Sequence, residues 1–382
     1  MPPSAHLRVV LALCTAGAAA GAACAAPRAR AGLSSVAARP RAAVRAASEP
    51  AAAPTAAATG SDELALPPAS FEALLRQAQA STLASVGDGH RLLEVEFPPL
   101  PTAILEDASS SAYDVSDANV RLAVRYAQGL GKRVAVLVPD RPELERAIKV
   151  AGGRQQPYAN VSLHSLTGSS PVLSGGGAQG ADNSIEGFFS RIFNIERLGK
   201  ANVTIVPEAE IYVILTVSCQ ELPDVERLWA QDVAPNGRKA IVLFNLKLDT
   251  QRGDLGLPAF PRKALQHRFL SRVKPAYYLR SRSYSLSLRR PPFLLPFSGA
   301  LFRVYPGPFQ CLLDTGNGRY RMVRQYDRRP ALGEFKEDLR QALKVDPEDK
   351  GQASDVLTRG YKTKTWFEED AEGLDESDAW RT

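Results

Sequence analysis

Three polar side chains in this 382-residue sequence stand where an apolar stretch ends, a position from which they could contact a ligand. Asp140 closes VAVLVPD, Gln220 follows ILTVSC and Asn245 closes IVLFN. If these stretches are parallel strands, the three side chains reach the carboxyl edge of the sheet, where ligands bind in open α/β folds. Two of them also have ordinary structural roles open to them: Asp140 as a helix cap and Asn245 as a turn residue. We favour the structural roles, because no paired acid, base or nucleophile accompanies these residues.

A second candidate is a long stretch of one-signed charge. Between Leu255 and Gln310 there are ten Lys or Arg residues and no Asp or Glu. A run of like charge is usually a solvated face, but aromatic residues accompany this one, so it predicts a surface that faces an anion. The arginines on which this predicted docking surface rests are Arg280, Arg282, Arg289, Arg290 and Arg303.

Motifs for cofactors and metals are weak or missing in the sequence. Gly175–Gly180 fits the dinucleotide pattern GxGxxG, but it follows a Ser/Pro-rich loop late in the chain, so we interpret it as a flexible loop. No P-loop, GxSxG or HExxH pattern occurs. We therefore expect no cofactor, no metal site and, with less force, no enzymatic activity. Nucleic acid is disfavoured as a partner because no RNA-binding motif accompanies the arginines.

The charge is unevenly distributed along the chain. The net charge is +6, but the first 60 residues hold six Arg and one Glu, which leaves 41 basic and 40 acidic residues in the remainder. Within those 60 residues an apolar stretch ends on small residues, and an acid-free stretch rich in Arg, Ser and Ala follows. This succession predicts a plastid-targeting presequence over residues 1–60, signal-like and then transit-like, with a plain chloroplast transit peptide or an untargeted low-complexity segment as alternatives. No later stretch is long and apolar enough to span a membrane.

The elements that must position these residues alternate in type. The expected helices cover residues 68–86, 114–131, 141–151, 184–199, 221–234, 261–273 and 330–344. The expected strands cover residues 91–97, 132–139, 202–207, 211–218 and 239–246, and then 276–288, 300–314 and 320–327. This order predicts an α/β fold over residues 61–344: a three-layer sandwich with a mostly parallel, mixed sheet, extended by C-terminal antiparallel strands and a closing helix. Residues 152–183 are expected to be a loop.

The remaining features concern the cysteines and the C-terminal tail. Cys219 and Cys311, the two cysteines outside the presequence, lie in apolar surroundings and are predicted to be buried structural thiols. Residues 345–382 hold eleven acidic and five basic residues, so we expect a disordered tail. The alternative is that this acidic segment, with Trp366, Phe367 and Trp380, docks on a basic surface of this chain or another.

Several segments together resemble a known family. They are FPPLP, DANVRLAVRYAQGL, VAVLVPD, IVLFNLKL, FLSRVKPAYYLRS, GALFRVYPGPFQCLL and RRPALGEFKEDL. This pattern resembles the plant, algal and cyanobacterial domain-of-unknown-function family nineteen-ninety-five, over about residues 65 to 343. The family includes the low-photosystem-II-accumulation assembly factor and chloroplast proteins related to adenylate kinase. Phe309 stands where the family more often has Trp.

The resemblance implies a location and a role but no catalytic motif. It implies a protein of the plastid stroma that associates with the thylakoid and assists photosystem II assembly, docking peripherally on a thylakoid protein or on anionic lipid. The kinase domain of the adenylate-kinase-related members is missing from this sequence. A phosphate- or nucleotide-binding domain or enzyme, using Asp140, Gln220 and Asn245 at the sheet edge, stays as the alternative function.

Overall fold

The computed structural model describes residues 65–101, 104, 111–168, 202–257, 260–316, 318–344 and 364–382. Residues Asp62–Thr382 form one compact unit. The predicted presequence, the helix expected at residues 184–199 and the GxGxxG motif lie outside the described residues.

The unit is built on a nine-stranded mixed sheet with the order β3-β2-β4-β5-β1-β6-β7-β8-β9. Its parallel strands are β1 Leu92–Glu96, β2 Val134–Val138, β3 Val161–Ser165, β4 Ile211–Ile214 and β5 Ala240–Phe244. Its remaining strands are β6 Lys274–Ser287, β7 Leu294–Val304, β8 Phe309–Asp314 and β9 Tyr320–Tyr326. The long strand β6 joins the two halves, because it pairs in parallel with β1 and antiparallel with β7.

Side-chain alternation assigns each strand residue to one face of the sheet. In β5, Val242 and Phe244 pack into one core while Ile241 and Leu243 pack into the other. Helices cover both faces of the sheet, so the side chains on both faces are buried. This explains why the central parallel strands are nearly continuous apolar runs. In β1, Leu93 and Val95 belong to the first core, which turns Glu94 toward the second face.

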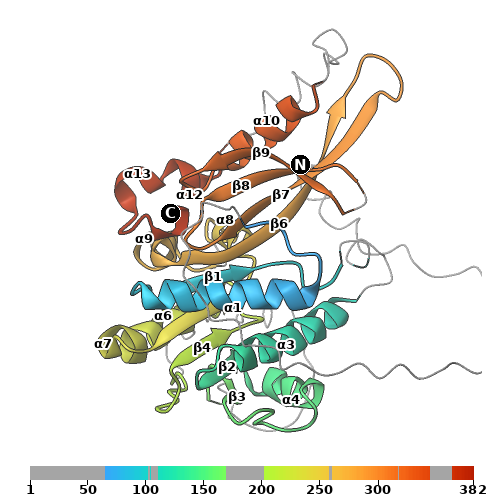
Figure 1. Ribbon diagram of the computed structural model, residues 1–382. Helices are drawn as coiled ribbons and strands as arrows, with labels where there is room; N and C mark the ends of the chain where they lie inside the picture. Colours follow the sequence, from blue (N-terminus) through green and yellow to red (C-terminus); the bar gives the residue numbers. More distant parts are fainter. Residues whose placement is uncertain are drawn as a thin grey trace, which may run out of the picture. The chain divides into compact units, whose positions relative to one another are not determined.

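Helices lie on both faces of the sheet (Figure 1). The first face is covered by α1 Phe71–Gly87, α3 Ala112–Gly129 and α4 Arg141–Val150. The second face is covered by α6 Leu222–Leu228 with η2 Trp229–Val233 and α7 Ala234–Asn236, by α8 Leu248–Asp254, and by α9 Ala264–Arg268 with η3 Leu270–Arg272. Helix α10 Leu332–Ala342 packs Phe335 and Leu339 against the antiparallel strands. This arrangement confirms the predicted three-layer α/β fold, including the antiparallel extension and the closing helix.

Some predicted elements differ from those observed. The strand expected at residues 202–207 is reduced to a single bridge between Thr167 and Val203. Strand β3 lies inside the stretch expected to be a loop, and helix α8 follows β5 where no helix was expected. The long helix expected at residues 261–273 is a short α9 followed by one turn of 3₁₀ helix.

Disorder was the wrong prediction for the last part of the tail. Residues 364–382 form α12 Trp366–Glu369, α13 Ala371–Leu374 and η5 Ala379–Arg381, and the side chains of Phe367 and Trp380 are buried. Acidic residues of this segment pair with basic residues elsewhere in the unit. The pairs are Lys263–Asp370 at 3.5 Å, Arg272–Glu376, and Arg328–Asp378 at 2.7 Å. The acidic-aromatic segment thus docks on this chain's own basic residues, the alternative that its composition left open.

Candidate functional site

Two of the three residues predicted at the carboxyl edge of the sheet have structural roles. Asp140 caps α4 by accepting a hydrogen bond from Glu143 N at 3.0 Å. Asn245 accepts a hydrogen bond from Phe97 N at 2.8 Å and donates one to Asn119 at 2.9 Å, so its amide joins β5, β1 and α3. Gln220 is exposed in the turn before α6. The cavity described below is not lined by any of the three.

The five predicted docking arginines do not form one exposed surface. Arg280 and Arg282 are partly buried and pair with Asp249, while Arg303 is only 4% exposed. The Arg303 guanidinium lies over the Phe309 ring at 4.7 Å, and burial together with the positive charge of Arg329 lowers its pKa to about 10. The prediction of a single basic wall was wrong for these three, because Asp249 of an earlier segment pairs with Arg280 and Arg282, and the nearby Phe309 ring covers Arg303. Arg289 and Arg290 are exposed.

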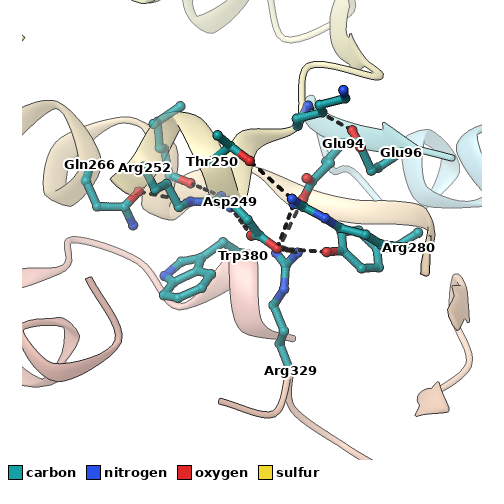
Figure 2. Close-up of polar contacts among 12 residues, drawn as sticks. Glu94, Glu96, Asp249, Thr250, Arg252, Gln266, Arg280, Arg329 and Trp380 are labelled. Atoms are coloured by element: carbon teal, nitrogen blue, oxygen red, sulfur yellow. Dashed lines mark hydrogen bonds and ion pairs between the residues drawn. The ribbon is translucent and has the colours of Figure 1, made fainter. Parts of the chain in front are cut away.

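Arg280 and Arg282 belong instead to a charged cluster around Asp249. Figure 2 shows Arg280 in this cluster with Asp249, Arg252 and Arg329. At its centre is Asp249, on the first turn of α8. We define the Asp249 cluster as this carboxylate with its four guanidinium partners. Their closest N–O distances to it are 3.0 Å for Arg329, 3.3 Å for Arg252, 3.3 Å for Arg280 and 3.5 Å for Arg282.

The environment of Asp249 keeps it ionised. Burial alone would raise its pKa, but the neighbouring positive charges of Arg329, Arg252 and Arg280 hold the pKa below its ordinary value. The Tyr278 hydroxyl also donates a hydrogen bond to Asp249 Oδ2 at 2.8 Å. One buried carboxylate therefore shares the charge of four arginines.

Two further carboxylates approach the cluster from β1. Glu94 is 1% exposed, and its nearest charged partner is Arg329, with Nη1 at 3.5 Å from Oε2. Glu96 accepts a hydrogen bond from Lys247 N at 3.0 Å. Burial, and next the negative charge of Glu94, raise the pKa of Glu96 to about 7. Near neutral pH Glu96 is therefore only partly ionised, which leaves the arginines in excess over the carboxylates around them.

A cavity of about 130 Å³ opens beside the Asp249 cluster. Its charged lining residues are Arg280, Arg282, Arg329, Asp249 and Glu368, and its apolar lining includes Phe335 of α10. Phe367 and Trp380 of the C-terminal segment complete the wall. Among the described residues, no group of His, Cys, Asp and Glu side chains is arranged to hold a metal ion.

The other exposed feature is the turn between β6 and β7. We define the hairpin tip as residues 288–294; Figure 1 shows this hairpin projecting beyond the neighbouring strands. Phe293 is 60% exposed and Leu294 is 55% exposed, and Arg289 and Arg290 are exposed beside them. Backbone hydrogen bonds from Phe293 N to Arg290 O at 2.9 Å and from Leu288 N to Phe293 O at 2.8 Å hold the turn. The tip therefore presents positive charge and apolar surface together.

The sequence interpretation missed the centre of the charged cluster. Asp249, Arg329 and Glu94 were not singled out, because they come from three distant segments of the chain. One signal was available: LLEVEF places two carboxylates in a strand that is otherwise apolar, and a central strand of this kind buries both faces. The cysteine prediction is confirmed, since Cys219 and Cys311 are free and buried.

The fold and the site define a mixed α/β domain with a buried arginine–carboxylate cluster and a projecting hairpin. Residues 68–337 match the family model described as "Domain of unknown function (DUF1995)". The chain belongs to this family, as the sequence resemblance indicated. The search of curated proteins found no match to the chain, and neither did the search of solved structures.

Proposed function

We propose that this chain is a non-enzymatic plastid protein that docks peripherally on the thylakoid during photosystem II assembly or maintenance, with the hairpin tip as its contact. The observation that carries the proposal is the pairing of exposed arginines with exposed Phe293 and Leu294 on one projecting turn. Arginine attracts anionic headgroups, while an aromatic ring and a leucine gain by leaving water at the interface. Residues 1–60 supply the targeting signal in this proposal.

The occupant that best fits the tip is an anionic lipid surface. Each basic residue near such a surface contributes about 1 kcal/mol, which falls as salt screens the charge. Among the described residues, no helix has the length and apolar character needed to cross a bilayer. In this proposal the chain therefore attaches reversibly, through a few residues.

Vesicle flotation tests this proposal with residues 62–382, which form one compact unit and leave out the arginines of the first 60 residues. We expect binding to vesicles of phosphatidylglycerol and phosphatidylcholine, little binding to phosphatidylcholine alone, and weaker binding as salt rises. Arg289→Glu should weaken binding about tenfold, because it reverses one charge at the membrane. Phe293→Asn should also weaken it while keeping a residue that tolerates the left-handed φ of 57°.

The matched control is Arg238→Glu, the same charge change at an exposed arginine outside the hairpin. Equal losses for Arg238→Glu and Arg289→Glu would mean that overall charge, not the tip, drives binding. If the chain binds thylakoid membranes but not vesicles, and protease treatment of the membranes abolishes that binding, the partner is a protein instead. Import into the plastid of a fluorescent protein fused to residues 1–60 tests the proposed location separately.

A further inference from the structure

The cavity beside the Asp249 cluster has the charge of an anion site. Three guanidinium groups line it together with the carboxylates of Asp249 and Glu368, and Glu94 lies within ion-pair distance of Arg329. The two oxygens of Glu368 accept hydrogen bonds from Leu332 N and Thr365 N. Asp249 is also shared with Arg252, which is not part of the cavity lining and whose Nε donates to Gln266 at 3.0 Å. With Arg252 included, four guanidinium groups lie in or beside the cavity wall against three carboxylates, Asp249, Glu94 and Glu368, so the excess of positive charge is one.

Donor groups in the wall also remain unused. Arg329 is 95% buried at its side chain, and its Nη1 has no hydrogen-bond acceptor among the described residues. The Nη1 of Arg280 likewise has no acceptor, and the two carboxylate oxygens of Glu94 have no donor, among the described residues. Both Nη1 atoms lie within 3.5 Å of a carboxylate oxygen, so they are ion-paired, but the geometry does not complete a hydrogen bond. A buried donor without an acceptor is costly, and an oxyanion in the cavity would supply acceptors.

The remaining wall groups suit a small, tetrahedral oxyanion. Arg280 Nη2 is held by Thr250 Oγ1 at 3.1 Å, and Arg329 is held against the Tyr278 ring at 4.3 Å, so two guanidinium planes are fixed before any ligand arrives. Fixed guanidinium groups are well matched to phosphate oxygens, because each can donate two parallel hydrogen bonds. The volume of about 130 Å³ is well below the roughly 300–1,000 Å³ of sites for larger organic ligands.

We propose that the cavity bounded by Arg280, Arg282 and Arg329 is a binding site for a phosphate-type oxyanion, either inorganic phosphate or the phosphate of a small monoester. Arg329 and Arg280 form the fixed inner wall, and Arg282, whose side chain is 28% exposed, closes the rim. Phe367 and Trp380 are part of the same wall and shield it from water, which strengthens the charge interactions with the ligand. This site is independent of the hairpin tip and of the proposed docking function.

Calorimetric titration of the full chain with inorganic phosphate, at ionic strength held constant with sodium chloride, tests the proposal. We expect saturable binding of one phosphate per chain. Arg282→Gln should weaken it by about tenfold or more, because it removes a charged donor at the rim. The matched control Arg319→Gln, at an exposed arginine that does not line the cavity, should leave the affinity unchanged.

Other ligands and a second variant separate the possible results. Glycerol phosphate binding with similar affinity would identify a monoester phosphate as an acceptable ligand, and sulfate should compete. Arg282→Lys keeps the charge and the fold but loses the second donor, so it should bind phosphate with intermediate affinity. Three results would overturn the proposal: no binding of phosphate, equal phosphate affinities of Arg282→Gln and the wild type, or a higher affinity for ATP than for phosphate.

Discussion

Replacing Glu96 by Gln should raise the free energy of unfolding, relative to that of wild type, increasingly as the pH rises. Glu96 is buried in β1 beside Glu94, and its pKa is raised to about 7 from an ordinary 4.5. The amide oxygen of Gln can still accept the hydrogen bond from Lys247 N, so the substitution mainly removes the titration. Glu94, Asp249 and Arg280 also face this group, and all three are unchanged in the variant.

The sign and size follow from proton linkage. Between pH 4.5 and 7 the folded protein keeps the Glu96 proton while the unfolded chain has lost it, so the wild-type free energy of unfolding falls as pH rises. Two and a half pKa units correspond to about 3 kcal/mol, of which about 2.5 kcal/mol lies between about pH 5 and pH 8. The stability of Glu96→Gln minus that of wild type should rise by about that amount over this interval.

Urea denaturation at several pH values measures this difference directly. Glu145→Gln serves as the control, since the Glu145 side chain is 68% exposed and should leave the pH dependence as in wild type. A difference between Glu96→Gln and wild type that stays constant from pH 5 to 8 would refute the reasoning. So would a difference that shrinks as pH rises.

Three further substitutions test the packing described above, each by urea denaturation. Trp380→Ala should cost about 3–5 kcal/mol, because it empties a buried aromatic site in the C-terminal segment; a change below 1 kcal/mol would mean that the segment is not packed. Gly299→Ala should cost about 1–3 kcal/mol, since its new Cβ would lie 2.5 Å from the carbonyl oxygen of Leu312; an unchanged midpoint would contradict this close approach. Asn245→Gly should cost about 1–3 kcal/mol, because it leaves the buried Phe97 N–H without its acceptor, while glycine still suits the backbone φ of 52°. Asn245→Asp retains an acceptor for Phe97 N–H and should cost less.

The fold could be predicted because its strongest signals are local. Buried parallel strands must be apolar on both faces, so VAVLV and AIVLF stand out without any knowledge of their partners. Strand β3 was missed because it is an edge strand, and its polar Ser162, His164 and Ser165 are only half-buried. Helix α8 was missed because its seven residues LDTQRGD show no apolar periodicity. Hydrogen bonds from Gln251 to Val217 O and Leu246 O, both at 2.7 Å, hold it in place.

The site was much harder to predict, because its charges neutralise one another only in three dimensions. A block of arginines without carboxylates indicates an exposed basic face when partners are sought nearby in the sequence. Asp249 precedes the block, however, and the acidic residues that pair with Lys263 and Arg272 come about a hundred positions after those two residues. Long-range pairing of this kind leaves no periodic pattern in the sequence. The exposed hairpin tip kept the character that the local sequence indicated.

The position of β1 in the sheet has a consequence for how the chain folds as it is synthesised. Leu92 pairs with Ile241 and Leu93 with Lys274, so this early strand lies between two strands that are synthesised much later. A nascent chain that ends before β6 leaves one edge of β1 open, and such contacts between distant segments form slowly. Chaperones that hold the emerging polypeptide until residue 274 has passed would therefore protect this protein more than one whose first strand pairs with its immediate neighbour.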